Sequence, residues 1–205
     1  MAIVAALKPI STSGREPRRF LNPQDGCWHV QITQGETHVS DVDNEILTTV
    51  LGSCIAACIR DPLARVGGMN HFLLPEGDGK DRNAQRYGVN AMELLINGLL
   101  KRGASRDRLE AKLFGGANVL AGLSDVGSRN AAFAEKFLRD EGIPVVGGDV
   151  RGNHPRRIQY WPFSGRARQL AMPTAESVSV VERERATAAA KGRSNVEDGN
   201  DVELF

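Results

Sequence analysis

The chain has 205 residues, a formal net charge of +1 and a hydrophobic content of 41%. This length suits one ordinary domain with tails, and the near-neutral charge gives no electrostatic indication of nucleic acid or of an anionic membrane as a partner. The three cysteines do not suggest a disulfide framework, and no apolar run is long enough to cross a bilayer or to act as a signal sequence. We therefore expect a soluble protein of the reducing cytoplasm.

The N-terminal part is predicted to begin with a flexible lead-in and to continue as strands. Residues 1–19 mix Ser, Thr, Pro and Arg without periodicity. Residues 27–33 alternate apolar and polar side chains, as a half-buried strand does, and residues 37–39 are candidates to pair with them across a turn. Residues 46–50 form a further expected strand.

A β-hairpin is predicted next. Residues 55–59 and 66–74 are strand-like runs, and the Asp-Pro pair between them is typical of a turn. A hairpin of this kind can return His71 to a position beside Cys54.

The middle of the chain is predicted to be mainly helical. In residues 83–103 apolar side chains recur at helical spacing, and Gly103 can end the helix. A second helix is expected near residues 128–140, with Ser128 as its N-cap. Further strands are expected before and after this second helix, at residues 109–114, 143–146, 157–163 and 166–172.

Strands at both ends and two helices in the middle favour an α/β fold of the α+β type, in which mixed or paired sheets carry the helices on one side. We expect residues 20–173 to form this single domain. Residues 174–205 are rich in Ala, Ser, Arg and Glu and are expected to form a disordered tail. Its terminal sequence, DVELF, is either incidental or a docking peptide.

Cys54 and His71 are the first candidates for chemistry. Gly52 and Ser53 can form a tight bend that presents the sulfur, and a thiol needs a nearby imidazole and some exposure to act as a nucleophile. The alternative for Cys54 is a buried core cysteine, which is what we expect for Cys58 on the same predicted strand.

Other kinds of site fit the spacing less well. A zinc site would need clustered Cys and His pairs, but no CxxC motif occurs and the other histidines are scattered, so we expect neither a metal nor a cofactor. The glycine pair in FGGAN lacks the context of a phosphate-binding loop and is expected to be a tight turn beside the active site. A basic loop near the C-terminal end is either solvated or a docking edge for acidic helices, formed by Arg151, Arg156 and Arg157.

The chain also resembles a known family. The motifs are LGSC, DP, GGMNHFLLP, RYGVNAMELLINGLLKRGA, RLEAKLFGGAN, RNAAFAEKFLRDEGIPVVGGDV and GNHPRRI, in this order between about residues 18 and 172. They are similar to those of the chemoreceptor glutamine deamidases, the CheD family. When the motifs are matched, the family's catalytic cysteine falls on Cys54, its catalytic histidine on His71 and its assisting threonine on Thr48.

The resemblance implies a layered α/β/β arrangement, related to bacterial toxins that also deamidate glutamine. It implies a protein-glutamine glutaminase that acts on the cytoplasmic helices of chemoreceptors in chemotaxis. Cys54 would attack the side-chain amide, and His71 would act as general base before returning a proton to departing ammonia. Thr48 would orient the imidazole or hold the substrate amide, and the N–H groups of the bend at Gly52 and Ser53 are candidates to stabilise the oxyanion.

A second function stays open at this point. Members of the family also bind the chemotaxis phosphatase CheC and raise its activity, so the chain could instead be a binding module for a CheC-like phosphatase. A general thiol protease is a third class, disfavoured because a small open hairpin site offers no evident peptide cleft. The presence of Thr48, Cys54 and His71 favours the deamidase.

Overall fold

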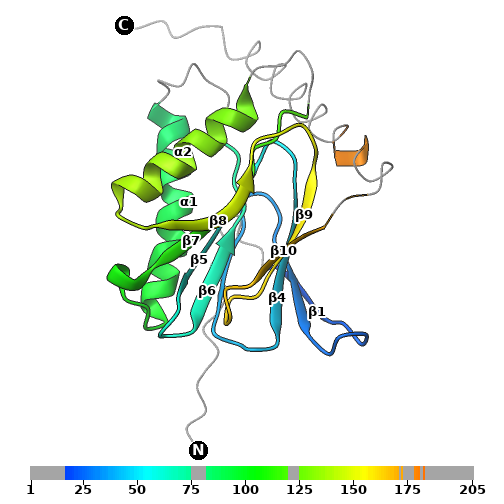
Figure 1. Cartoon of the computed structure of the whole chain (residues 1–205), viewed down its shortest axis with the longest axis vertical. Coiled ribbons are helices and arrows are strands. Elements are labelled where there is room, and N and C mark those ends of the chain that lie inside the picture. Colours follow the sequence, from blue (N-terminus) through cyan, green and yellow to red (C-terminus); the bar gives the residue numbers. More distant parts are fainter. Residues whose placement is uncertain are drawn as a thin grey trace, which may run out of the picture.

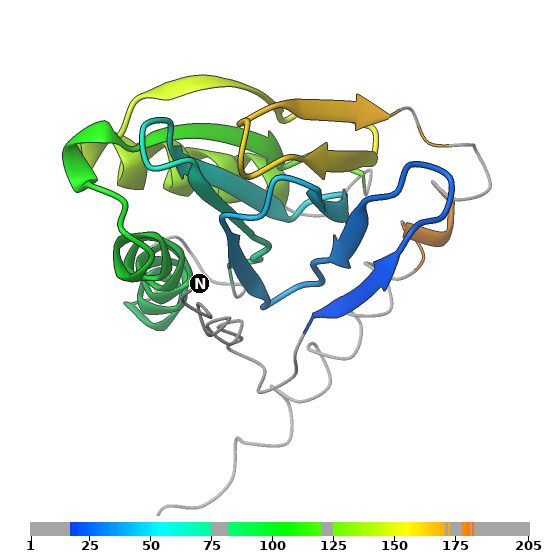
Figure 2. The same ribbon diagram turned by 90° about the horizontal axis from the view of Figure 1, so that it is seen from below.

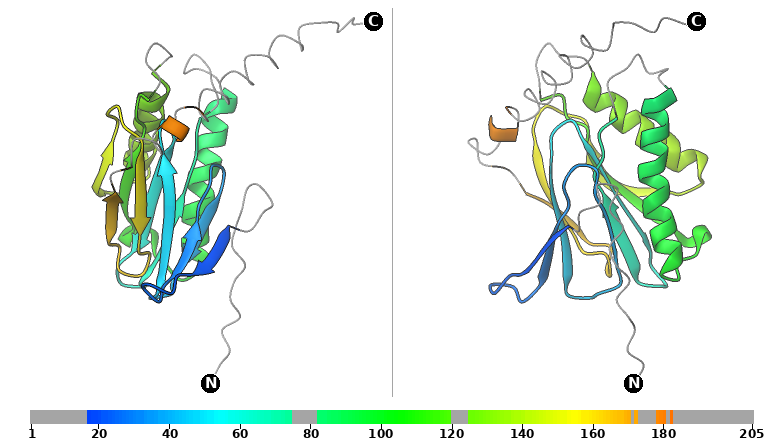
Figure 3. Two further views of the ribbon diagram at one scale, coloured as in Figure 1. Left: turned by 90° about the vertical axis from the view of Figure 1, so that its right-hand side faces the viewer. Right: turned by 180° about the vertical axis from the view of Figure 1, so that it is seen from behind.

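The computed structural model describes residues 17–74, 82–119 and 125–170, together with residues 172, 178–180 and 182. In this part of the chain two five-stranded sheets stack face to face, and two helices cover the outer face of one of them (Figure 1). Figures 2 and 3 show the same layers from below and from the side. This arrangement confirms the predicted α/β fold of the α+β type with α/β/β layers.

The first sheet combines N-terminal strands with the last two strands of the domain. Its parallel pair is β2 with β4, and its other neighbouring strands are antiparallel. The order is β1 (Arg18–Leu21), β2 (Trp28–Gln31), β4 (Glu45–Leu51), β9 (Arg156–Tyr160) and β10 (Ala167–Leu170).

The second sheet lies between the first sheet and the helices. Its parallel pair is β7 with β8, and β5 and β6 form the predicted hairpin. The order is β3 (Thr37–Ser40), β6 (Val66–Asn70), β5 (Ile55–Asp61), β7 (Glu110–Gly115) and β8 (Val145–Val150).

Both predicted helices are present. α1 (Arg82–Lys101) packs on β6, β3 and β5, and α2 (Val126–Asp140) packs on β5, β7 and β8. A short 3-10 helix, η1 (Arg106–Arg108), leads from α1 into β7. None of the described helices is long and apolar enough to cross a membrane.

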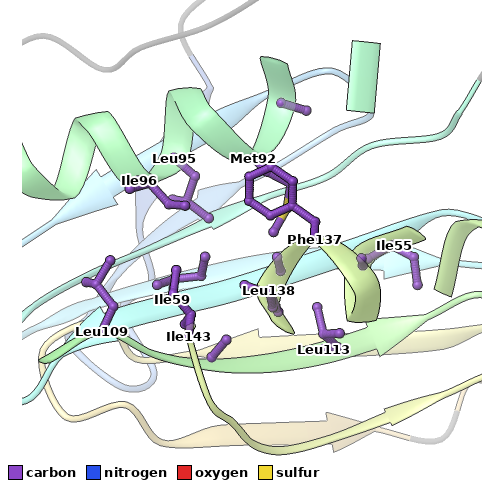
Figure 4. Packing of buried hydrophobic residues seen from close by; sticks show 14 of the residues in the cluster. Ile55, Ile59, Met92, Leu95, Ile96, Leu109, Leu113, Phe137, Leu138 and Ile143 are labelled. Atoms are coloured by element: carbon purple, nitrogen blue, oxygen red, sulfur yellow. The ribbon is translucent and has the colours of Figure 1, made fainter. Parts of the chain in front are cut away.

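Two apolar layers hold the elements together. In the layer between the helices and the second sheet, Ile55 and Ile59 of β5 lie opposite side chains such as Met92 of α1 and Leu138 of α2 (Figure 4). The layer between the two sheets contains residues of both, including Cys58. Because β5 has an apolar layer on each face, nearly all of its residues are buried and its sequence reads as a continuous apolar run.

Three local expectations differ from the structure. β3 pairs with β6 and not with β2, because residues 32–36 carry the chain from the first sheet to the second. β1 begins inside the expected lead-in, and its four exposed residues give no alternating pattern to predict it from. The residue before α2 is Asp125, so Ser128 lies inside the helix and is not its N-cap. Residues 1–16 and the terminal DVELF lie outside the described residues.

Candidate active site

The candidate nucleophile lies where the chain crosses from one sheet to the other. β4 of the first sheet ends at Leu51, and β5 of the second sheet begins at Ile55. Gly52, Ser53 and Cys54 form the bend that joins them, as the Gly-Ser pair predicts. Cys54 belongs to the apolar cluster between the two sheets.

The loop after β7 binds two carbonyl groups of this bend. The backbone N–H of Ala117 donates to Gly52 O at 2.8 Å, and that of Gly116 donates to Cys54 O at 2.7 Å. Gly115 has a φ of +104°, and a Cβ atom there would lie 2.1 Å from Cys54 O, so the approach requires glycine. The FGGAN loop therefore lies beside the cysteine, although its residues continue β7 and an irregular segment and do not form the expected tight turn.

Asn130 of α2 binds the third carbonyl group of the bend. Its Nδ2 donates to Ser53 O at 2.8 Å, and its Oδ1 accepts from the backbone N–H of Leu74 at 3.1 Å. The side chain is 1% exposed, so these two hydrogen bonds replace those it would make with water. Sequence reasoning missed this residue. The available signal was a polar residue on the buried face of an amphipathic helix.

His71 and Cys54 lie on the same face of the second sheet. Ile55 and Phe72 form an antiparallel bridge, in which each backbone N–H donates to the other residue's carbonyl at 2.9 Å. The side chains of this bridge belong to the core under the helices, so the alternating neighbours, Cys54 and His71, face the first sheet. They are diagonal neighbours, a relation that in sheets spans roughly 7–8 Å between backbones and remains within reach of long side chains.

The hydrogen bonds around His71 fix its tautomer. Thr49 Oγ1 donates to Ile32 O at 2.7 Å, which uses the single proton of this hydroxyl group. His71 Nδ1 lies 2.9 Å from Thr49 Oγ1 and 3.4 Å from Ile32 O, so Nδ1 carries the proton and donates to both. Nε2 is then unprotonated, and this buried atom has no hydrogen-bond partner among the described residues. An unprotonated Nε2 can accept a proton from a thiol.

The threonine that holds the imidazole is Thr49, whereas the sequence points to Thr48. The two are neighbours on β4, so their side chains lie on opposite faces of the first sheet. Thr49 faces the second sheet with Leu47 and Leu51, while Thr48 Oγ1 lies 3.5 Å from Val30 O. The residue that orients the ring is therefore Thr49, one position after the predicted Thr48. The other expected role of Thr48, contact with the substrate amide, stays a prediction.

Burial makes His71 a neutral base. The residue is 7% exposed, and desolvation lowers the pKa of its imidazole to about 4, although the hydrogen bond to Ile32 O opposes this shift. At neutral pH the ring is therefore uncharged in the resting protein. It becomes charged only when a reaction transfers a proton to it from a neighbouring group.

Cys54 is 6% exposed, so the bend presents much less of it to solvent than the sequence predicts. The side chain of Gln34 lies against it, with Cys54 Sγ 3.9 Å from Gln34 Oε1. Burial and, secondarily, Cys54 raise the pKa of the Tyr87 phenol on α1. These two residues come from segments far away in the sequence, where no local pattern relates them to the cysteine.

The predicted docking arginines have different surroundings. Arg151 forms two hydrogen bonds of 2.7 Å with the carboxylate of Glu135 on α2. Arg156 is buried and donates to the backbone carbonyls of Asp149 and Arg151, so it holds the loop in place and is not part of an exposed docking edge. Arg157 is exposed.

The other possible sites gain no support. Cys58 is 1% exposed, and burial raises the pKa of its thiol far above the usual range, which confirms its expected place in the core. Within the described ranges no group of three or more His, Cys, Asp and Glu side chains could hold a metal ion.

The chain is similar to known proteins of one family. A family model described as CheD chemotactic sensory transduction matches residues 73–170. A protein of a Caulobacter species, named "Probable chemoreceptor glutamine deamidase CheD", is 57% identical over 178 residues, which cover 86% of this chain and 92% of that protein. Proteins of the same name from Caulobacter vibrioides and Agrobacterium fabrum are 66% and 54% identical and cover 68% and 86% of this chain, and 76% and 96% of their own lengths. The chain therefore belongs to the chemoreceptor glutamine deamidase CheD family.

Proposed function

We propose that this protein is a protein-glutamine deamidase, with Cys54 as its nucleophile and His71 as its general base. Its substrates are specific glutamine side chains of chemoreceptors, which become glutamate with release of ammonia. Membership of the CheD family supports the reaction and the substrate class. The observation that carries the residue assignment is the buried Nε2 of His71, which has no hydrogen-bond partner among the described residues and lies on the face of the sheet that also holds Cys54.

The first half of the reaction transfers the acyl group to the enzyme. His71 Nε2 takes the proton of the Cys54 thiol as Sγ attacks the amide carbon of the substrate glutamine. The tetrahedral intermediate carries its negative charge on the former carbonyl oxygen. It collapses when His71 returns the proton to the nitrogen, which leaves as ammonia, and a thioester with Cys54 remains.

The second half releases the product. A water molecule gives a proton to His71 Nε2 and attacks the thioester carbon. The new tetrahedral intermediate expels Sγ, which recovers the proton from His71, and the glutamate side chain is free. His71 therefore alternates between a neutral and a protonated state, while the proton on Nδ1 stays directed at Thr49 and Ile32 throughout.

The bend itself is the candidate for stabilising the oxyanion. Its three carbonyl groups are bound by the FGGAN loop and Asn130, so the orientation of its peptide units is fixed before substrate arrives. The peptide unit that carries the Gly52 carbonyl includes the N–H of Ser53, so this expected donor is fixed and would be able to donate to the developing charge without reorganisation. The N–H of Gly52 belongs to the preceding peptide unit and stays a candidate. One such donor is typically worth about 3–4 kcal/mol of transition-state stabilisation.

Substitution of the nucleophile tests the proposal directly. We expect Cys54→Ala to abolish deamidation of a purified chemoreceptor, a loss on the order of 10⁶-fold, because no other group can form the thioester. Peptide mapping by mass spectrometry before and after incubation measures the conversion. Cys27→Ala is the matched control, because Cys27 is half-buried in a loop outside the site. Undiminished conversion by Cys54→Ala would contradict the assignment. Stimulation of a CheC-like phosphatase that survives in this variant would reveal a separate binding function.

The two threonines of β4 can be separated by matched substitutions. Thr49→Val removes the acceptor for His71 Nδ1 and permits the tautomer with its proton on Nε2, which cannot act as the base. We therefore expect the rate of deamidation to fall on the order of 10²-fold, at the lower end of what general base catalysis contributes. Thr48→Val removes a hydroxyl on the opposite face. Initial rates of ammonia release compare the two variants. A loss confined to Thr48→Val would restore the assignment that the sequence favours.

The buried imidazole predicts a dependence of stability on pH. The folded pKa of His71, about 4, lies below the unfolded value of about 6.5, so its contribution is complete above pH 6.5 and is lost as pH falls toward 4. The shift corresponds to about 3 kcal/mol of unfolding free energy. Urea unfolding between pH 7 and pH 4 measures the loss in the wild type and in His71→Gln. An equal loss in both proteins would show that His71 is not its source.

Asn130 tests the importance of the held bend. Asn130→Ala removes the donor to Ser53 O and the acceptor for Leu74 N–H, so we expect deamidation to fall roughly 10- to 100-fold as the bend loses its fixed orientation. Asn97→Ala, an exposed position on α1, is the control. Rates are measured at urea concentrations and temperatures at which both variants remain folded. A folded Asn130→Ala protein with wild-type activity would show that the bend does not need this support.

A further inference from the structure

Gln34 holds a carboxamide group against the candidate nucleophile. Its Oε1 lies 3.9 Å from Cys54 Sγ, a distance at which the thiol can donate a hydrogen bond to the amide oxygen. The residue is exposed, so its side chain is not locked in place by packing. The functional group beside the sulfur is thus the same group that a substrate glutamine would bring.

The backbone on either side of Gln34 is fixed to the candidate base. The N–H of Gly35 donates to His71 O at 2.7 Å, and the N–H of His71 donates to Glu36 O at 3.0 Å. The carboxylate of Glu36 also accepts from the N–H of Thr33 at 2.7 Å. These contacts hold the segment between β2 and β3 across the site, so an exposed side chain on a fixed backbone presents the carboxamide.

We propose that Cys54 deamidates Gln34 of its own chain, which makes Gln34 a site of self-modification. The inference rests on the proposed function, because it uses the same nucleophile and base. Tethering replaces a bimolecular encounter by an intramolecular one, and this gives the carboxamide a high effective concentration at the sulfur. A substrate glutamine from a receptor must then compete with Gln34 for the same position.

The step needs only water as a co-reactant. Sγ forms a bond with Cδ of Gln34 as the thiol proton passes to His71 Nε2, and the C–N bond breaks as the nitrogen takes that proton and leaves as ammonia. The resulting thioester joins two side chains of one molecule. Water then attacks Cδ, the C–S bond breaks, and the thiol is restored beside a carboxylate at position 34. The negative charge of that carboxylate disfavours a second anion on the sulfur, so the modification slows later turnover.

The test follows residue 34 in the full chain over time. Wild type and Cys54→Ala are produced and stored in parallel, and peptide mapping measures the fraction of Gln34 converted to glutamate. We expect conversion to rise in the wild type and to stay at background in Cys54→Ala. Gln31 on β2, which is also exposed, is the internal control and should stay unconverted in both proteins. Equal conversion in both proteins, which spontaneous chemistry at a Gln-Gly pair would give, overturns the proposal.

A mixing experiment decides whether the reaction is within one chain. Isotope-labelled Cys54→Ala is incubated with unlabelled wild type at several concentrations. We expect the labelled chain to remain unconverted and the rate in the wild type to be independent of concentration. Conversion of the labelled chain would show attack between molecules and would overturn the intramolecular step.

Receptor assays on the same samples separate this inference from the proposed function. Wild type that deamidates a receptor but leaves Gln34 intact overturns the self-modification alone. Conversion of Gln34 without any receptor activity supports the self-modification and contradicts the proposed substrate. If neither Gln34 nor the receptor is converted, the self-modification and the proposed function are both overturned, because the shared nucleophile would then be inactive.

Discussion

The fixed bend between the two sheets is the constraint on which the site depends. All three carbonyl groups of Gly52, Ser53 and Cys54 are bound, two by backbone N–H groups of the loop after β7 and one by a buried asparagine of α2. The second sheet and the helix layer therefore determine where the sulfur lies. The same sheet supplies the strand that brings His71 to the adjacent position, so one set of backbone contacts positions both of the proposed reacting groups.

Burial in the layer between the sheets determines the chemical character of the pair. The imidazole is neutral in the resting protein because desolvation lowers its pKa, and the described acceptors Thr49 and Ile32 hold its single proton on Nδ1. The thiol has little exposure to solvent. In the proposed mechanism, charge separation therefore accompanies the attack on a carboxamide and does not precede it, which limits other reactions of the sulfur.

Local patterns in the sequence predicted the secondary structure around the candidate site better than they predicted which side chains meet there. The Gly-Ser bend, the β5–β6 hairpin and the periodicity of both helices are local signals, and the structure contains all of them. Thr49 could not be distinguished from Thr48 by motif matching, because a shift of one residue along a strand reverses the face on which a side chain lies. Gln34 reaches the site through tertiary packing, for which no local pattern exists, and the only signal for Asn130 was its place as a polar residue on the buried face of α2. The burial of Arg156 could not be predicted for the same reason, because a basic run is expected to be solvated unless the carbonyl groups that it binds are known.

Interception of the covalent intermediate tests the central claim most directly. A receptor peptide that contains a target glutamine is mixed with the protein, the reaction is quenched with acid within its first turnover, and the digest is searched for a peptide joined through a thioester. The proposed mechanism predicts this adduct on Cys54 and its release as a hydroxamate when hydroxylamine is added. Deamidation that proceeds at the normal rate while Cys54 stays unmodified throughout would contradict the account.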